Sequence, residues 1–201
     1  MTLLEERPAE ALREQSIPVL ETERLVLRAP RLGDAKAIAT LANDRRIAEN
    51  TARIPHPYRL VDAEAFIAGV NIPGGETVFL ITDSDDTVLG GCGVGMGDGQ
   101  GPELGYWLGV PFWGQGYATE AVRAVIDYAF TELDLEFLSA GARVTNPPSR
   151  RVLEKCGFQW TGVGLYRIRA LKSSAPVDRF RLDRGLCETQ LFSRAAGCWV
   201  S

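Results

Sequence analysis

The stretch Trp113-Gly-Gln-Gly-Tyr-Ala-Thr-Glu120 decides how the fold is to be interpreted. Two glycines end an aromatic-rich segment here and lead directly into an amphipathic helix. Glycine lets the backbone turn tightly because it has no Cβ atom, and the first turn of a helix offers unpaired amides and the positive end of the helix dipole. Such a junction binds phosphate without a basic side chain. The sequence therefore predicts a diphosphate-binding site at this point.

The segment that follows has the hydrophobic period of a helix that lies on the surface of a core. Its apolar residues recur at intervals of three and four, with polar residues between them. The predicted inward face is Ala118, Ala121, Val122, Val125, Ile126, Ala129 and Phe130, and the predicted outward face is Thr119, Glu120, Arg123, Asp127, Thr131 and Glu132.

The whole chain has the size and composition of one compact domain. It contains 201 residues, of which 45% are hydrophobic and 24% are charged, and its formal net charge is −4. An acidic chain lacks the electrostatic footprint of a general nucleic-acid binder, and no apolar run approaches the roughly 20 residues that span a bilayer. We therefore expect a soluble cytoplasmic protein with no nucleic-acid and no membrane partner, and a homodimer stays an open alternative.

Metal and thiol chemistry are not expected. The four cysteines, Cys92, Cys156, Cys187 and Cys198, are widely separated, and the only histidine is His56. Because a zinc site needs closely spaced ligands, the sequence predicts no metal. We interpret the cysteines as small buried hydrophobic residues, and His56, which stands between two prolines, as a loop or acceptor-pocket residue without a proton-transfer role.

The order of the expected elements is mixed. A strand, a helix and a strand follow one another over residues 103–144, which favours a parallel pair inside a sheet that is antiparallel elsewhere. The predicted fold class is therefore α/β (an α+β mixed sheet) in a single domain. Strands are expected at 24–28, 76–82, 87–96, 103–110, 136–144, 158–169 and 177–182, a hairpin turn at 83–86, a loop at 171–176, and helices from the N-cap Asp34 to Leu41, at 43–50, from Asp62, from the glycine pair onward, and at 147–156.

Glycines alternate from Gly91 to Gly101. On a strand this spacing strips one face of side chains, while Cys92, Val94 and Met96 occupy the other. Two interpretations stay open. The glycines either permit close packing or a flexible loop, or they leave a bare surface where a ligand or an acceptor approaches the backbone.

Two familiar nucleotide-binding motifs do not fit. In a dinucleotide fingerprint a third glycine or alanine would stand where Thr119 is, and Asp134 and Glu136 precede the next strand instead of ending it. A P-loop requires Gly-Lys-Ser or Gly-Lys-Thr, and neither occurs in the chain.

Three consecutive motifs resemble those of the GCN5-related N-acetyltransferases, the GNAT superfamily. They are Gly-Tyr-Trp-Leu-Gly-Val (105–110), Trp-Gly-Gln-Gly-Tyr-Ala-Thr-Glu-Ala (113–121), and Asn-Pro-Pro-Ser (146–149) followed by Leu-Glu-Lys-Cys-Gly-Phe (153–158). The opening Glu-Thr-Glu-Arg-Leu-Val-Leu-Arg (21–28) is similar to the RimJ/RimL-like branch, which acetylates ribosomal-protein N-termini.

This resemblance covers about residues 21–184 and implies a GNAT fold. In this fold a mostly antiparallel sheet has helices on both faces, and a central pair of parallel strands splays apart to hold acetyl-CoA. It implies acetyl-CoA as the co-substrate and an amine as the acceptor. The expected organisation is an N-terminal extension (1–20), a GNAT domain (21–186) and a C-terminal tail (187–201).

The resemblance also implies which residues hold the coenzyme. The family's loop, Gln/Arg-x-x-Gly-x-Gly/Ala, corresponds to Trp113-x-x-Gly116-x-Ala118, and its first position departs, so we expect Trp113 to pack beneath the loop. Asn146 has an ordinary alternative role in starting a helix, and Arg150, Arg151 and Lys155 either approach the 3′-phosphate or form a solvated face. The expected contacts are amides of Gln115, Gly116, Tyr117, Ala118 and Thr119 to the diphosphate, backbone groups of Leu108, Gly109 and Val110 to the pantetheine arm, and Asn146 from the far side.

Transfer of an acetyl group to an amine requires a neutral nitrogen, a polarised carbonyl and a stabilised leaving thiolate. Glu103 is the expected base, because the matching acidic position of the related branch faces the acceptor channel; its alternative is a surface charge. Many relatives carry a tyrosine acid where this chain has Leu153. The resemblance assigns Ser149 as hydrogen-bond donor or proton relay near the sulfur, with helix capping as its competing role. The expected polarising group is a backbone amide at 108–110.

The leading hypothesis is an acetyl-CoA-dependent N-acetyltransferase whose first acceptor is a protein N-terminus. A small-molecule amine (amino acid, polyamine or antibiotic) is the close alternative, and a non-catalytic acyl-CoA-binding module is the alternative from another class. Specificity is expected from the loop 55–58, the helix after Asp62 and the loop 171–176.

Overall fold

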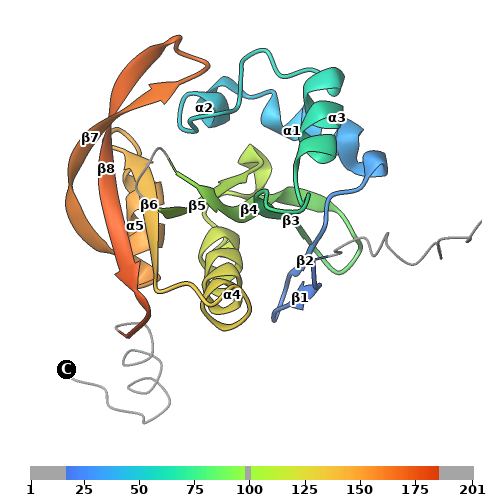
Figure 1. The fold of residues 1–201 in the computed structure, drawn as a ribbon. Coiled ribbons are helices and arrows are strands. Elements are labelled where there is room, and N and C mark those ends of the chain that lie inside the picture. The colour runs from blue at the N-terminus through green and yellow to red at the C-terminus, as the bar shows by residue number, and fades with distance from the viewer. Residues whose placement is uncertain (1–16, 98–100, 186–201) are drawn as a thin grey trace, which may run out of the picture.

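The computed structural model describes residues 17–97 and 101–185, which form one eight-stranded sheet with helices on both faces. The strand order is β1-β2-β3-β4-β5-β6-β8-β7. Figure 1 shows α1, α2 and α3 above the sheet and α4 below it. The strands are β1 (Leu20–Glu21), β2 (Val26–Arg28), β3 (Thr77–Thr82), β4 (Val88–Met96), β5 (Pro102–Leu108), β6 (Phe137–Arg143), β7 (Gln159–Ile168) and β8 (Ser173–Asp183). The helices are α1 (Ala35–Ala42), α2 (Arg45–Ala48), α3 (Leu60–Gly69), α4 (Tyr117–Thr131) and α5 (Pro147–Lys155), with short 3-10 turns η1 (Leu32–Asp34) and η2 (Val110–Phe112).

The sheet is antiparallel except between β5 and β6, as the strand–helix–strand pattern predicts. In the described chain, the parallel ladder consists of Glu103 opposite Ser139 and Leu104 opposite Ala140. The Ser139 hydroxyl closes the base of this junction by donating to the Pro102 carbonyl at 2.8 Å. Both strands continue beyond the ladder, so the main chains of β5 and β6 diverge, and the predicted mixed sheet with one parallel pair is confirmed.

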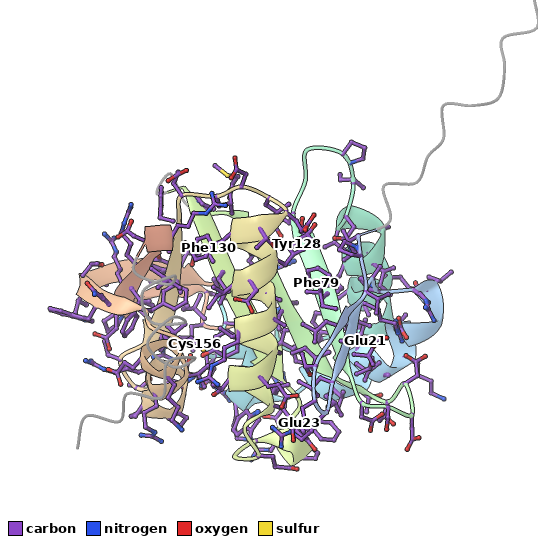
Figure 2. The ribbon with its side chains drawn as sticks, turned by 90° about the horizontal axis from the view of Figure 1, so that it is seen from below. Glu21, Glu23, Phe79, Tyr128, Phe130 and Cys156 are labelled. Carbon is purple, nitrogen blue, oxygen red and sulfur yellow. The ribbon has the colours of Figure 1, made fainter. Side chains whose placement is uncertain are left out.

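Helix α4 packs along the middle of one sheet face (Figure 2). The Tyr128 ring meets the Phe79 ring of β3 edge to face, with 5.3 Å between centroids. The predicted phase of this helix is confirmed, apart from Ala118, which is half-buried, and Tyr128, which joins the inward face. Its buried residues are Ala121, Val122, Val125, Ile126, Tyr128, Ala129 and Phe130. A smaller core on the opposite face joins α1 and α3 to Leu80, Val88 and Trp107.

Several predicted element limits are wrong, and each has a local cause. The strand expected from Arg24 starts only at Val26, and β8 begins at Ser173, so the loop expected at 171–176 is mostly strand. Pro176 is accommodated there opposite Leu165. The helix expected from Asp62 begins two residues earlier, and the Asp62 carboxylate accepts the Arg59 amide at 2.9 Å.

Asp34 stands at the predicted N-cap of α1 but does not cap it. Its carboxylate accepts the Arg31 amide at 2.7 Å and forms two hydrogen bonds with the guanidinium of Arg28. Arg28 is 4% exposed. A buried guanidinium needs an anionic partner, so Asp34 neutralises Arg28 instead of satisfying the helix terminus.

The alternating glycines of β4 are closely packed, which decides between the two interpretations of this segment. An ideal Cβ atom on Gly93 would lie 2.5 Å from the Thr77 carbonyl oxygen, and one on Gly95 would lie 2.6 Å from the Glu76 carboxylate. The opposite face of the strand carries Cys92 and Val94 in the α4 core. These glycines therefore permit close approach within the sheet.

Both described cysteines, Cys92 and Cys156, are buried, as expected, and burial raises the pKa of the Cys92 thiol. Cys187, Cys198 and the predicted tail lie outside the described residues, as does most of the predicted extension, although Ile17 and Leu20 pack against the main core. Within 17–97 and 101–185 no cluster of three potential metal ligands occurs, and no helix has the length and apolarity to cross a membrane.

Candidate active site

The glycine loop before α4 has the backbone conformation that anion binding at a helix N-terminus requires. Gly114 and Gly116 have φ angles of 77° and 86°, in the left-handed region, and Gly116 is the N-cap of α4. The amide of Glu120 donates to the Gly116 carbonyl at 3.1 Å. The helical bonds begin there, so the amides of residues 117–119 precede the first intrahelical donor. They belong to the set of amides, from residues 115–119, that the sequence predicts to bind a diphosphate, and this role stays a prediction.

The loop is fixed to the end of β5 by two side chains. The Trp113 indole N–H donates to the Leu108 carbonyl at 2.8 Å, and the Gln115 side-chain amide donates to the Pro111 carbonyl at 3.0 Å. Trp113 remains 45% exposed. The tryptophan thus supports the loop by a hydrogen bond, whereas the sequence predicts that it packs beneath the loop.

An ion pair that sequence reasoning missed fixes the loop from its other side. Arg24 bonds to the Glu120 carboxylate through its side chain at 2.6 Å, and donates to the Gln115 carbonyl at 3.0 Å. The Thr22 hydroxyl also donates to Glu120, at 2.7 Å. Burial opposes ionisation of Glu120, but the hydrogen bonds from Thr22 and Arg24 outweigh it and lower its pKa. Glu120 is therefore an anchor of the loop, although its helical phase predicts an outward position.

The diverging strands leave backbone groups of β5 directed toward β6. The Gly109 amide donates to the Leu89 carbonyl at 2.8 Å, which makes Gly109 a hydrogen-bonded position of the β4–β5 ladder. Because these positions alternate, the backbone groups of Tyr106 and Leu108 point toward the gap. The amide of Gly109 is engaged within the sheet, and the carbonyls of Leu108 and Val110 already accept from the indole and the amide of Trp113, at 2.8 Å and 3.2 Å. The role of residues 108–110 in binding the pantetheine arm stays a prediction.

Across the gap, the start of α5 shows which of Asn146 and Ser149 caps the helix. The Asn146 side-chain oxygen accepts the Ser149 amide at 3.3 Å, so Asn146 caps the helix. The Ser149 hydroxyl lies 2.8 Å from the phenol oxygen of Tyr106 on β5. The serine side chain therefore faces the sheet, and the helix terminus does not depend on it.

Glu103 lies at the base of the gap, on the sheet face opposite α4. One of its carboxylate oxygens is 2.4 Å from the ideal Cβ position of Gly97, and the other is 3.8 Å from that of Gly141 on β6. The ring of Tyr166 approaches the same Gly141 position at 3.5 Å. Two residues along β5, Gly105 is exposed, with no atom within 4 Å of its ideal Cβ position. The predicted base thus stands beside an open strip of backbone.

The basic residues of α5 do not share one environment. Arg150 bonds to Glu154 at 2.8 Å and also contacts Asp178, so its charge is engaged within the protein. Lys155 borders a groove of about 1290 Å³ between residues 18–24 and the outer side of α4. The same groove reaches Gly116 and Thr119 at the loop. Lys155 is thus better placed than Arg150 for a phosphate near the loop.

The proline-rich loop contributes a core residue as well as an exposed one. Tyr58 is buried, its amide donates to the Asn43 side chain at 2.9 Å, and burial raises the pKa of Tyr58 to about 12. His56 is exposed. The tip of the β7–β8 hairpin reaches this region, because the Arg169 amide donates to the Ala52 carbonyl at 3.0 Å.

The site suits an acyl-coenzyme A by three observations on the protein alone. The α4 terminus offers amide donors, the ideal Cβ position of Gly114 has no atom within 4 Å, and the divergence of β5 and β6 leaves strand-type hydrogen-bonding groups in between. A diphosphate and an extended amide-containing arm need these two kinds of donor in this order.

Comparisons with known proteins agree with this geometry. The family model described as acetyltransferase (GNAT) domain matches residues 24–159. The uncharacterized N-acetyltransferase p20 of Bacillus licheniformis is 34% identical over 149 residues, which cover 72% of this chain and 84% of that protein.

Two solved structures share the fold. Mycobacterium smegmatis RimJ, in complex with CoA-disulfide, has a TM-score of 0.73 at 20% identity and covers 92% of this chain and 96% of its own. Spermidine N-acetyltransferase from Vibrio cholerae, in complex with CoA and spermine, has a TM-score of 0.70 at 23% identity and covers 83% of this chain and 99% of its own.

Proposed function

Because this chain belongs to the GNAT family of acetyl-CoA-dependent N-acetyltransferases, we propose that it transfers an acetyl group directly to a primary amine within a ternary complex, and that its first acceptor is a protein N-terminal α-amine. One observation supports direct transfer. From the diphosphate end toward the opposite sheet face, the site consists of the glycine loop of α4, then the β5–β6 gap, then Glu103. A donor held in this gap meets an acceptor that arrives over Gly105.

The coenzyme is held by backbone groups in this proposal. Amides of residues 115–119 bind the diphosphate. The amide of Val110 binds the pantetheine arm together with the carbonyl of Leu108, which also accepts the Trp113 indole N–H. Bound acetyl-CoA supplies an activated acyl carbon and a thiolate leaving group. Asn146 shapes the opposite wall by capping α5, a role supported by its 3.3 Å hydrogen bond to the Ser149 amide.

Two side chains carry the chemistry. Glu103 accepts the proton of the acceptor ammonium, directly or through a water, which supplies the neutral nitrogen that attacks. The amide of Leu108 polarises the acyl oxygen, because a backbone donor directed into the gap stabilises the charge that develops there. Ser149 stabilises the departing sulfur, and this role is supported by a hydroxyl that faces the sheet instead of capping the helix.

The choice of a protein N-terminus is supported by the likeness to RimJ and by the open strip at Gly105, which admits an extended chain end. A small-molecule amine is the second candidate, favoured by the likeness to a spermidine N-acetyltransferase. Short peptides with free N-termini and a panel of amino acids, polyamines and aminoglycosides, assayed side by side for coenzyme A release, separate the two. A preference for the small amines in kcat/KM would contradict our choice.

The coenzyme site is tested by a matched pair of glycine variants. Gly116→Val and Gly74→Val each put a β-branched side chain at a positive φ angle, 86° and 72° respectively, and Gly74 lies in the turn between α3 and β3. We expect both to lose stability, by about 1–3 kcal/mol, while only Gly116→Val weakens coenzyme A binding in calorimetry, by tenfold or more. Equal affinities for the two variants would remove the loop from the coenzyme site.

A non-catalytic acyl-CoA-binding module is the remaining alternative. It predicts tight acetyl-CoA binding with no turnover on any acceptor, unchanged in Glu103→Gln and Ser149→Ala. A cytoplasmic location and a homodimer belong to our proposal as well, and cell fractionation and light scattering test them.

A further inference from the structure

The hydroxyl of Tyr106 makes a contact that the reaction described above does not use. It lies 2.8 Å from the Ser149 hydroxyl oxygen and 3.1 Å from the Ser149 carbonyl oxygen. Burial raises the pKa of this phenol, although the hydrogen bond to Ser149 acts in the opposite direction. The phenol therefore remains protonated, and it is a hydrogen-bond donor throughout the accessible pH range.

One phenol proton allows two arrangements. If it is donated to the serine hydroxyl oxygen, the proton of Ser149 is left free to point elsewhere. If it is donated to the carbonyl, which can only accept, the serine proton must point back at the phenol. The 2.8 Å contact between the two hydroxyl oxygens exists in both arrangements. We assign the first because, in a helix, the carbonyl of Ser149 is already the acceptor for the amide four residues later.

From this contact we propose that Tyr106 is a positioning residue, which directs the Ser149 hydroxyl as a hydrogen-bond donor toward the sulfur of coenzyme A. This inference rests on the proposed function. When the carbon–sulfur bond breaks, its electron pair stays on the sulfur, and the serine stabilises that charge without giving up its proton. The nitrogen releases its second proton to solvent as the amide forms, and the thiolate takes up one proton from solvent on release, so these two protons balance. This chain has a buried leucine, Leu153, at the helix position where many relatives carry a tyrosine acid. The phenol near Ser149 comes from the sheet instead, from Tyr106.

The ionisation of the bound thiol tests this inference without any acceptor. Coenzyme A bound to the wild-type protein is titrated by the ultraviolet absorbance of its thiolate. A donor aimed at the sulfur favours the charged form, so Tyr106→Phe and Ser149→Ala each lower the thiolate fraction at fixed pH by about tenfold, and the double variant lowers it no further. An unchanged or increased thiolate fraction in Tyr106→Phe overturns the proposal.

Kinetics provide a second readout with a matched control. We expect Tyr106→Phe to lower kcat by about tenfold, with KM for acetyl-CoA unchanged, and Ser149→Thr to keep most of the activity because it keeps the hydroxyl. Tyr128→Phe removes a buried phenol that bonds to Thr77 of β3 and leaves kcat unchanged. A rise of kcat in Tyr106→Phe would support the second arrangement and overturn ours.

The two proposals fail in distinguishable ways. If the wild-type protein acetylates no amine, yet the two variants shift the bound thiol as expected, the acceptor proposal fails and the positioning role stands. If amine transfer occurs and Ser149→Ala changes neither thiol ionisation nor kcat, the positioning role fails alone. If coenzyme A does not bind at all, both fall.

Discussion

Glycines occur in two regions around the candidate site, and the space around them differs. In β4 they are enclosed: an ideal Cβ atom on Gly93 would meet the Thr77 carbonyl at 2.5 Å. Directly across the ladder, Gly105 pairs with Gly93, and its ideal Cβ position has no atom within 4 Å. One glycine permits strands to approach each other, and the other leaves room for a molecule that is not part of the chain. The surroundings of a glycine, and not its spacing, therefore distinguish packing from binding.

The largest effect is expected in the enclosed region. Gly93→Ala forces the Cβ atom against the backbone of β3, so the free energy of unfolding falls by about 3 kcal/mol. Urea denaturation, with the slope checked for two-state behaviour, measures it. A loss below about 0.5 kcal/mol would show that β3 yields easily and that the enclosure of Gly93 is not a constraint.

An intermediate effect is expected where Glu120 anchors the glycine loop. Its lowered pKa means that the ionised carboxylate stabilises the fold above the unfolded pKa of about 4.3, and that this contribution disappears as the pH falls through the folded value. We expect the free energy of unfolding of the wild-type protein to exceed that of Glu120→Gln by about 1 kcal/mol at pH 7, and by nearly nothing well below pH 4. The value at pH 7 is small because Arg24 is partly exposed to solvent.

Unfolding curves of both proteins between pH 3 and pH 7 check this dependence. Glu132→Gln, at the exposed other end of α4, is the control and keeps the wild-type pH profile. A Glu120→Gln difference that stays constant over this range would mean that the charge of Glu120 is not what stabilises the loop.

The smallest effect on stability is expected at Gly105. Gly105→Ala adds a methyl group to open space, so the free energy of unfolding changes by no more than about 0.5 kcal/mol. If the acceptor crosses this strip, kcat/KM for the acceptor falls severalfold while KM for acetyl-CoA stays constant. Steady-state kinetics with each substrate varied in turn separate the two. An unaltered acceptor kcat/KM would place the acceptor path elsewhere.

Sequence patterns predicted those parts of the structure that depend on contacts between residues close together in the chain. The inward face of α4 follows from a period of three to four, and the conformation of Gly116 follows from a turn that no other residue adopts easily. The order of strands around α4 likewise follows from the short connections on either side. In these places the residues that determine the structure are neighbours along the chain.

Contacts between distant segments escaped prediction. Glu120 is on the polar side of its helix by period, and it becomes an anchor through Thr22 and Arg24, which lie 98 and 96 residues earlier in the chain. The Ser149 hydroxyl faces Tyr106 across 43 residues, and nothing near either residue indicates that they meet. Asp34 has the sequence of an ordinary N-cap, but the buried charge of Arg28 uses its carboxylate first.

The short parallel ladder at Glu103 and Leu104 has a mechanical consequence. Strands β1–β5 and strands β6–β8 form two halves of the sheet, and in the described residues the strand pairing that joins them is this short ladder. A ligand that fills the gap above it adds a bridge between the halves. Binding there would restrict the movement of the two halves relative to each other, and the folded protein would be most stable with its acetyl donor bound.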